Sequence, residues 1–347
     1  MATGVRCVLI LQLLLLLLVA ATGVSSRTTY TGSSAAGEGT APAKPKKMVP
    51  ALVVFGDSIM DPGNNNAIHT IVKANFPPYG HDFGPDHRPT GRFSNGKIPT
   101  DFLASRLGLK DLLPAYLAPD LTSHDLLTGL RMFDDYKQKV RAAAGDAALS
   151  DILAKGIFVV CTGSDVTNTY FTLRARSSYS HASYASFVVA HAAAFLDGLL
   201  SAGARHVAVI SLPPVGCMPS QRTLSGGMAR DCSPGPNEIA EMVNAGMGSA
   251  VDSLKANNPG AKVVLVDMYG FFMDMMVRPQ GYGFRESTLG CCGTGMMEVS
   301  VLCNGVTSAV CGVIADYLFW DSYHPTEKAY GILVDFVYDE YLQKLIE

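Results

Sequence analysis

The sequence has no excess of charge of either sign. It holds 27 basic and 30 acidic residues among 347, a formal net charge of −3, and so it lacks the basic surplus typical of proteins that bind nucleic acid. It also has no Cys-x-x-Cys pair and no cluster of His and acidic residues at metal-ligand spacing, so neither a metal nor another cofactor is expected. The Asn-x-Ser/Thr pattern is absent too, and N-glycosylation is therefore not expected.

Long apolar runs are absent except at the N-terminus. Downstream of Arg6 comes VLILQLLLLLLVAA, with the small residues ATGVSS at its end, which is typical of a secretory signal peptide over residues 1–25. A membrane anchor is the alternative, but the run is shorter than the roughly 20 residues that span a bilayer. Residues 26–47, rich in small and polar residues, predict a disordered leader. We expect a secreted protein, extracellular or in the cell wall, with no stable membrane anchor and no other spanning segment.

Seven of the eight cysteines lie beyond the expected signal peptide. A secreted chain meets an oxidising compartment, where disulfides are the default. Cys217 and Cys232 are spaced to close a short loop, and the four cysteines from Cys291 to Cys311 can supply two more bridges, whose pairing the sequence leaves open. Cys161 lies in the apolar run GIFVVC and is expected to be a buried free thiol.

Apolar β-branched runs alternate with longer helical patterns after the leader. Strands are predicted at 50–55, 156–161, 206–212 and 261–270, and helices at 99–109, 184–204, 237–260 and 325–347. This alternation predicts a parallel sheet between layers of helices. With no internal repeat and no change of composition, a single α/β domain over 48–347 is the simplest organisation.

Ser58 follows the first predicted strand, in the segment GDSIMDPGNNN. Ligands of open parallel sheets bind beyond the carboxyl ends of the strands, and Gly56 allows a sharp turn there. An Asp-Ser pair after a strand is also a common helix N-cap, which is the alternative interpretation. The Gly-x-Ser-x-Gly nucleophile elbow is absent, so a nucleophilic Ser58 would belong to a fold other than the α/β-hydrolase fold.

A serine nucleophile needs a base, most often a histidine oriented by a carboxylate. Of the eight histidines, His324 alone lies in a segment with these features, the loop WDSYHPTE before the last helix. Asp321, three residues earlier, can accept from the second imidazole nitrogen and fix the tautomer. A metal-ligand pair is the rival interpretation, but the rest of the chain offers no further ligands with recognisable spacing.

Long motifs along the mature chain resemble one known family. They are VVFGDSIMDPGNNN, FPPYGHDFGPDHRPTGRFSNGKIPTDFLA, SLPPVGCMPSQRTL, LGCCGTGMMEVSVLCN and FWDSYHPTEKAY. They are similar to segments of the plant GDSL esterase/lipases, a branch of the SGNH hydrolase superfamily. The resemblance implies a plant protein with a three-layer α/β/α sandwich and flavodoxin-like strand order. It also implies a monomeric, metal-independent hydrolase of small-molecule, lipid or cell-wall esters, with Ser58 as nucleophile, His324 as base and Asp321 as orienting carboxylate.

The sequence departs from that family around the oxyanion hole. The family uses the nucleophile's backbone N–H, a Gly backbone N–H and an Asn side chain. On the order of thirty residues that would carry the Gly are missing after Gly129, either in the molecule itself or through an incomplete gene model. The Asn of the family's Gly-x-Asn-Asp is either deleted or replaced by Ser164 in the stretch Cys161-Thr162-Gly163-Ser164-Asp165. The Ser58 N–H is therefore the expected donor, with Ser164 as a weaker substitute. Each lost donor typically costs about 2.7–4 kcal/mol of transition-state stabilisation.

Three functions remain open at this point. The first is hydrolysis of carboxylic esters through a Ser–His–Asp triad. The second is acyl transfer on the same triad, in which an alcohol takes the place of water. The third is a catalytically impaired secreted binding protein, which the altered oxyanion segments favour. We expect an esterase or lipase whose turnover depends on how much of the oxyanion hole this chain keeps.

Overall fold

Four short apolar segments form a parallel sheet in the computed structural model, which describes residues 47–117, 133–161, 170–171 and 175–347. The strands are β1 (Leu52–Gly56), β2 (Ile157–Cys161), β3 (His206–Ile210) and β4 (Lys262–Val266). They pair in the order β1-β2-β3-β4 without register shifts, so Gly56, Cys161, Ile210 and Val266 are aligned at the carboxyl edge. The four strand predictions are therefore confirmed.

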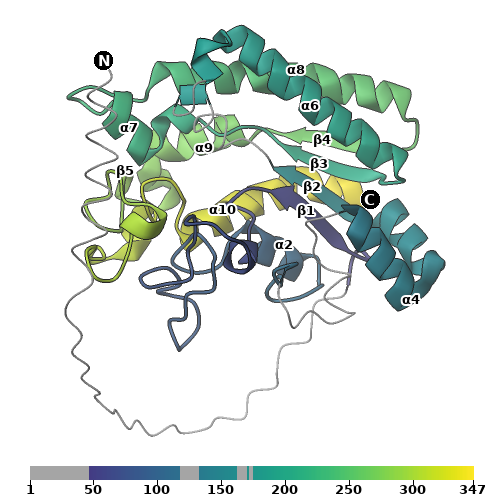
Figure 1. Ribbon diagram of the computed structural model, residues 1–347, viewed down its shortest axis with the longest axis horizontal. Helices are drawn as coiled ribbons and strands as arrows, with labels where there is room; N and C mark the ends of the chain where they lie inside the picture. The colour runs from purple at the N-terminus through teal and green to yellow at the C-terminus, as the bar shows by residue number, and fades with distance from the viewer. Residues whose placement is uncertain (1–46, 118–132, 162–169, 172–174) are drawn as a thin grey trace, which may run out of the picture. The chain divides into compact units, whose positions relative to one another are not determined.

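Successive sheet residues point to opposite faces and enter two separate cores. Val53 and Phe158 pack with side chains of α4 (Phe133–Lys155), α6 (His181–Ser201) and α8 (Pro234–Asn257) on one face. Leu52 and Val159 pack with α2 (Pro99–Arg106) and α10 (Glu327–Val337) on the other. Figure 1 shows α6 and α8 on one side of the sheet and α2 and α10 on the opposite side. The predicted three-layer α/β/α sandwich is confirmed.

The strand order has one difference from the flavodoxin-like pattern, which places a strand on each side of the first strand. Within the described part of the chain β1 pairs with β2 alone and forms the edge of the sheet. The observed order is thus the flavodoxin-like order without its outer strand. Gly129, after which we predicted missing residues, lies outside the described residues.

Several elements differ from their predicted bounds. The fourth strand ends at Val266 because the Asp267 side chain accepts from Gly270 N and caps α9 (Met268–Val277). The last predicted helix is divided into α10, a π turn over Tyr338–Leu342, and α11 (Gln343–Ile346). Three helices, α4, α7 (Pro219–Ser225) and α9, were not predicted. Nor was the second sheet, in which β5 (Glu286–Gly290) pairs in parallel with β6 (Tyr317–Phe319).

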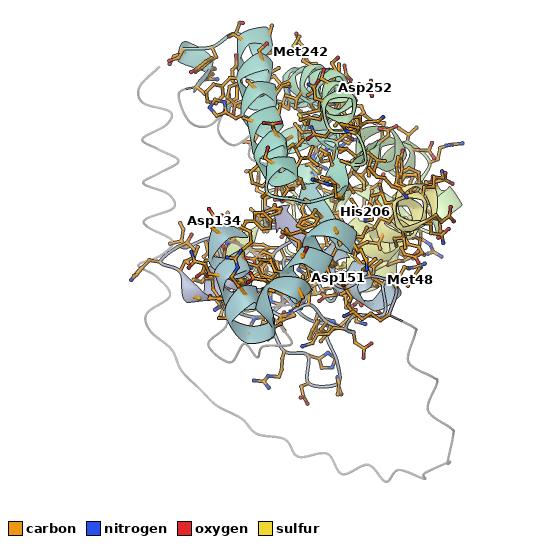
Figure 2. All side chains as sticks on the ribbon, turned by 90° about the vertical axis from the view of Figure 1, so that its right-hand side faces the viewer. Met48, Asp134, Asp151, His206, Met242 and Asp252 are labelled. Atoms are coloured by element: carbon orange, nitrogen blue, oxygen red, sulfur yellow. A yellow bond between two sulfur atoms is a disulfide. The ribbon has the colours of Figure 1, made fainter. Side chains whose placement is uncertain are left out.

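The helix α4 illustrates why some elements were missed. Gly145 inside it has φ 83° and ψ 172°, so the helix is interrupted at its centre. Only Tyr136, Val140, Leu149 and Ile152 are buried along its length. Figure 2 shows α4 from the side, with Asp134 and Asp151 labelled on it. Because the interruption breaks the 3.6-residue period, the segment has no continuous apolar stripe from which a helix could be predicted.

Three disulfides join the cysteines that were expected to pair. Cys217 bonds to Cys232, which confirms the short loop, and Cys291 bonds to Cys311 while Cys292 bonds to Cys303. The pairing that the sequence left open is therefore resolved. Cys161 is a buried free thiol, as predicted, and burial raises its pKa well above the usual range.

The helix α6 corrects one expectation about membranes. By length and composition it could cross a bilayer, although we expected no such segment after the signal peptide. Its hydropathy comes from the many Ala, Val and Leu residues of HASYASFVVAHAAAFLDGLLS. Leu196, Leu199 and Leu200 on its inner face pack into the core beside the sheet.

Candidate active site

Asp321 and His324 lie in a tight loop between β6 and α10. The loop is closed by two backbone bonds, Trp320 N to His324 O at 2.8 Å and Thr326 N to Leu318 O at 3.0 Å. The Thr326 side chain then accepts from Ala329 N and caps α10. Both functional side chains are therefore held between a strand end and a capped helix, and they are 0% and 3% exposed respectively.

Backbone hydrogen bonds from two disulfide-bonded cysteines, just after β5, also hold this loop. Cys291 N donates to Phe319 O at 3.0 Å, and Cys292 N donates to Trp320 O at 2.8 Å. The Gly290 position at the end of β5 requires glycine, because a Cβ there would lie 2.5 Å from the backbone of Asp321. The segment LGCCG thus approaches the Asp321 backbone closely enough to fix it.

Ser58 lies just past β1, at the carboxyl edge of the main sheet. The chain turns sharply at Gly56, where a Cβ would lie 2.7 Å from the Met60 Cβ and 3.1 Å from the Cys161 carbonyl. Met60 N donates to Asp57 O at 3.0 Å and closes the turn around Ser58. Ser58 itself is half-buried, so its hydroxyl lies at the edge of the sheet where ligands of such folds bind.

The structure brings the three predicted residues together across 266 positions of sequence. Ser58 Oγ is 2.8 Å from His324 Nε2. On the other side of the ring, His324 Nδ1 is 2.8 Å from Asp321 Oδ2 and 3.0 Å from Oδ1. Asp321 Oδ1 also accepts from His324 N at 2.7 Å and from Tyr323 N at 2.8 Å. This arrangement can transfer the Ser58 proton to an imidazole whose tautomer is fixed by a buried carboxylate.

The segment after Ser58 is held by its own side chains. Asp61 Oδ1 accepts from Gly63 N at 3.1 Å and Asn64 N at 2.6 Å, while Oδ2 accepts from Asn65 N at 3.1 Å. Asn64 Oδ1 in turn accepts from Leu117 N at 2.9 Å. The side chains of DPGNNN thus accept hydrogen bonds from the segment's own backbone, and its end forms a 3-10 helix over Asn64–Ala67. These contacts hold the chain that follows Ser58.

A buried ion pair fastens the same loop to α2. Arg92 donates from Nε and Nη2 to the two oxygens of Asp101, both at 2.7 Å, and from Nη1 to Pro62 O at 3.1 Å. Arg92 is 6% and Asp101 0% exposed. Bidentate geometry and burial make this a strong, directional contact between the nucleophile loop and the helical layer.

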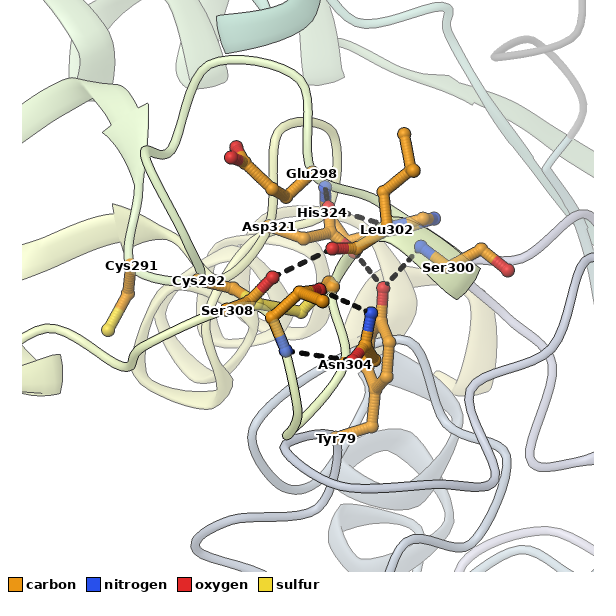
Figure 3. The surroundings of a disulfide bond; sticks show 12 residues. Tyr79, Cys291, Cys292, Glu298, Ser300, Leu302, Asn304, Ser308, Asp321 and His324 are labelled. Atoms are coloured by element: carbon orange, nitrogen blue, oxygen red, sulfur yellow. Dashed lines mark hydrogen bonds and ion pairs between the residues drawn. A yellow bond between two sulfur atoms is a disulfide. The ribbon is translucent and has the colours of Figure 1, made fainter. Parts of the chain in front are cut away.

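Sequence reasoning missed Tyr79, a buried residue that contacts the site. Its Oη donates to Asp321 Oδ2 at 2.7 Å, and Ser300 N donates to Tyr79 Oη at 2.7 Å. Figure 3 shows Tyr79 between these two partners. Tyr79 belongs to FPPYGHDFG, which the family resemblance covers, and that resemblance was the one signal that could have pointed to it.

An apolar cavity of about 60 Å³ lies under the carboxyl edge of the sheet. Its walls include Ile59 and Pro325, the residues that follow Ser58 and His324, together with Cys161, Met218, Phe272 and Val334. The cavity therefore offers an apolar space next to the reactive residues.

Two parts of the predicted site stay untested. Ser164, the expected side-chain oxyanion donor, lies outside the described residues, as does the position where the Gly donor was predicted to be missing. Over the described ranges, no group of three or more His, Cys, Asp or Glu side chains is placed to hold a metal ion.

The parallel sandwich and the Ser58–His324–Asp321 arrangement together are typical of an SGNH-type hydrolase. Residues 52–337 match the family described as GDSL-like Lipase/Acylhydrolase, and the chain belongs to that family. It is similar to the GDSL esterase/lipase EXL3 of Arabidopsis thaliana, with 42% identity over 87% of this chain and 90% of the relative. It is also similar to the GDSL esterase/lipase EXL2 of the same plant, with 37% identity over 86% and 89%. The chain is thus a carboxylic ester hydrolase by class, and of plant type.

These comparisons also bear on the missing segment. The similarity to EXL3 extends over 329 positions but takes in 87% of the 347 residues, about 302, so about 27 positions have no counterpart in this chain. A second Arabidopsis GDSL esterase/lipase gives the same difference, 350 positions against 93% of the chain, about 323 residues. For EXL2 the corresponding difference is about 42, from 340 positions against 86% of the chain, about 298 residues. These totals are of the order of the predicted loss of about thirty residues.

Proposed function

We propose that this protein is a secreted serine esterase, with Ser58 as nucleophile, His324 as base and Asp321 as orienting carboxylate. The observation that carries the proposal is the continuous hydrogen-bonded chain, 2.8 Å from Ser58 Oγ to His324 Nε2 and 2.8 Å from His324 Nδ1 to Asp321 Oδ2. Because a carboxylate can only accept, the imidazole keeps its proton on Nδ1 and Nε2 accepts from Ser58.

The proposed reaction has two halves. Ser58 Oγ attacks the ester carbonyl carbon while His324 Nε2 takes the hydroxyl proton. The tetrahedral intermediate collapses, the bond to the alcohol oxygen breaks, and His324 returns the proton to the leaving alcohol. Water then attacks the acyl-enzyme, again giving its proton to His324, and the acid leaves as Ser58 is reprotonated.

The oxyanion of each intermediate would be stabilised by the Ser58 backbone N–H, with Ser164 as the proposed second donor. A hydroxyl can rotate to donate one hydrogen bond, as the Asn of relatives would donate from its amide. One such donor typically supplies about 2.7–4 kcal/mol of transition-state stabilisation. The proposal therefore includes turnover that is limited by the oxyanion side of the site rather than by Ser58 and His324.

Secretion is supported by the disulfides and the leader together. Three bridges in one chain are typical of proteins that mature in an oxidising compartment. The predicted signal peptide over 1–25 gives the route to that compartment. This part of the proposal is tested by expressing the chain with and without residues 1–25. The chain with these residues should be found in the medium, and the chain without them should stay in the cells.

The catalytic part is tested by turnover of p-nitrophenyl acetate and butyrate by the purified chain, compared with Ser58→Ala. Ester hydrolysis by the wild type and none above background by Ser58→Ala is the expected result. A fluorophosphonate probe should label the wild type alone. Equal rates for the two proteins would refute the proposal, and a folded wild type that is neither labelled nor active would favour the binding protein.

The apolar cavity leads to a prediction about acyl chains. We expect Val334→Phe, which fills the cavity from α10, to lower kcat/KM for butyrate relative to acetate by about 10-fold, because one or two methylenes in an apolar pocket are worth that much or more. Val334 is 2% exposed and lines the cavity. The measurement is the ratio of kcat/KM for the two p-nitrophenyl esters.

Val251→Phe is the matched control for this substitution. Val251 is equally buried, at 3% exposed, but belongs to the core on the opposite face of the sheet. Both variants overpack a core and should lose about 1–3 kcal/mol of stability. A butyrate-to-acetate ratio that changes as much in Val251→Phe as in Val334→Phe would show that the cavity does not hold the acyl chain.

A further inference from the structure

A hydrogen-bonded connection links Asp321 to the disulfide-bonded segment through Tyr79. Tyr79 is 1% exposed, and its oxygen makes two bonds of 2.7 Å, one with Ser300 N and one with Asp321 Oδ2. A backbone N–H can only donate, so the phenol oxygen must accept from Ser300. The single phenol proton is therefore committed to Asp321, which fixes the direction of the whole connection.

Three aromatic rings pack against the ring of Tyr79. Its ring makes edge-on contacts with Phe76, Phe93 and Trp320, at centroid distances of 5.9, 5.9 and 6.5 Å. Phe93 also lies against the His324 ring, at 4.8 Å. Phe93 thus contacts both the phenol and the imidazole and packs the two rings into one aromatic cluster.

Ser300, whose backbone N–H donates to the phenol, is also held in place. Ser300 has φ 50°, in the left-handed region that few residues other than glycine adopt. It lies between the bonded Cys292 and Cys303, and its hydroxyl donates to Lys73 O at 2.9 Å and accepts from Lys73 N at 3.0 Å. Figure 3 shows Ser300 and Cys292 on the segment that faces Tyr79. The N–H that orients the phenol is therefore positioned by a covalent loop.

We propose that Tyr79 is a positioning residue of the active site, which holds Asp321 toward His324 and connects it to the Cys292–Cys303 loop. Its hydrogen bond takes one lone pair of Oδ2, so this oxygen cannot rotate away from His324 Nδ1. The bond also withdraws part of the carboxylate charge from the imidazole. Tyr79 thereby sets both the orientation of the base and how readily it is protonated.

The phenol can play this part over the whole working pH range. Burial, followed by the neighbouring Asp321 charge, raises the pKa of Tyr79 well above its usual range. The group therefore remains protonated and continues to donate in alkaline solution. A donor that lost its proton in this pH range could no longer donate to Asp321, whereas Tyr79 keeps its proton.

The inference rests on the proposed function and is tested with Tyr79→Phe, which keeps the ring but removes the hydroxyl. We expect kcat to fall about 10-fold with KM within about twofold, since a hydrogen bond to a charged group is lost away from the substrate. Without the phenol the full carboxylate charge faces the imidazole. The acid limb of the kcat/KM profile, and the His324 ring titration followed by NMR, should both move to higher pH by up to about one unit.

Tyr282→Phe is the control, because Tyr282 Oη also donates to a carboxylate, Asp274 Oδ2, at 2.6 Å. It should leave kcat and both titrations unchanged. Should Tyr79→Phe fail to fold, 3-fluorotyrosine at position 79 keeps the bond, makes the phenol a stronger donor and should move the His324 titration to lower pH. A His324 titration that is unmoved in these proteins overturns the role of Tyr79. An inactive wild type refutes the proposed function and leaves the NMR titration to decide on Tyr79.

Discussion

Asp321→Asn should lower kcat for p-nitrophenyl butyrate by about 10⁴-fold, the scale of effect expected when an orienting carboxylate becomes an amide. Two backbone donors, Tyr323 N and His324 N, face Oδ1 at 2.8 and 2.7 Å. They require an acceptor, so the asparagine oxygen takes the Oδ1 place and its NH₂ takes the place of Oδ2. That NH₂ then donates to His324 Nδ1 and moves the ring proton to Nε2, which can no longer accept from Ser58.

The fold should survive this change, because asparagine has nearly the same shape and the loop keeps its backbone bonds. Far-UV circular dichroism and thermal unfolding check that point, while kcat is followed from pH 6 to 9. Asp274→Asn is the control, since this carboxylate on α9 bonds Arg278 and Tyr282, which follow the helix. Its kcat should stay within about twofold, as for most surface changes. A folded Asp321→Asn protein within about tenfold of the wild type would contradict the orienting role of Asp321.

The main sheet could be predicted because its signal is local. Runs such as ALVVF and IFVVC are β-branched, short and bounded by Gly or Pro, which is the pattern of a strand buried on both faces. His324 and Asp321 could be proposed as a pair because they lie three residues apart in a loop before the last helix, but this spacing also fitted a metal-ligand pair. Their roles as base and carboxylate came from the family resemblance. The spacing alone allows both to face one another, and the structure has them 2.8 Å apart.

Tyr79 could not be predicted from local pattern, because its role depends on contacts 221 and 242 positions away. A tyrosine in a loop of Pro, Gly and Asp residues gives no period and no recognisable spacing. The disulfide pairing was open for a related reason. Cys291 and Cys292 are adjacent, so either could pair with Cys303 or Cys311 until the position of each strand end was known.

Arg92 is the residue whose loss should destabilise the fold most among the polar contacts of the site. We expect Arg92→Met to lower the free energy of unfolding by about 3–5 kcal/mol, because it leaves a buried charge without its partner. Asp101 is 0% exposed and would retain only the backbone donors Ile98 N and Leu113 N. The carbonyl of Pro62 would lose its donor as well, so kcat should fall together with stability.

Urea unfolding measures the loss, and two further variants separate its causes. Ile98 N and Leu113 N bond different oxygens of Asp101, so Arg92→Met/Asp101→Asn removes the buried charge but keeps an acceptor for only one of them. It should still recover part of the stability lost in Arg92→Met. Arg106→Met breaks an ion pair with Asp335 that is 38% and 52% exposed, and it should cost no more than about 1 kcal/mol. If Arg92→Met costs as little as Arg106→Met, the buried pair does not fasten the nucleophile loop. A double variant as unstable as Arg92→Met would instead attribute the loss to the carbonyls of Pro62 and Leu113, which both lose the Arg92 guanidinium as a donor.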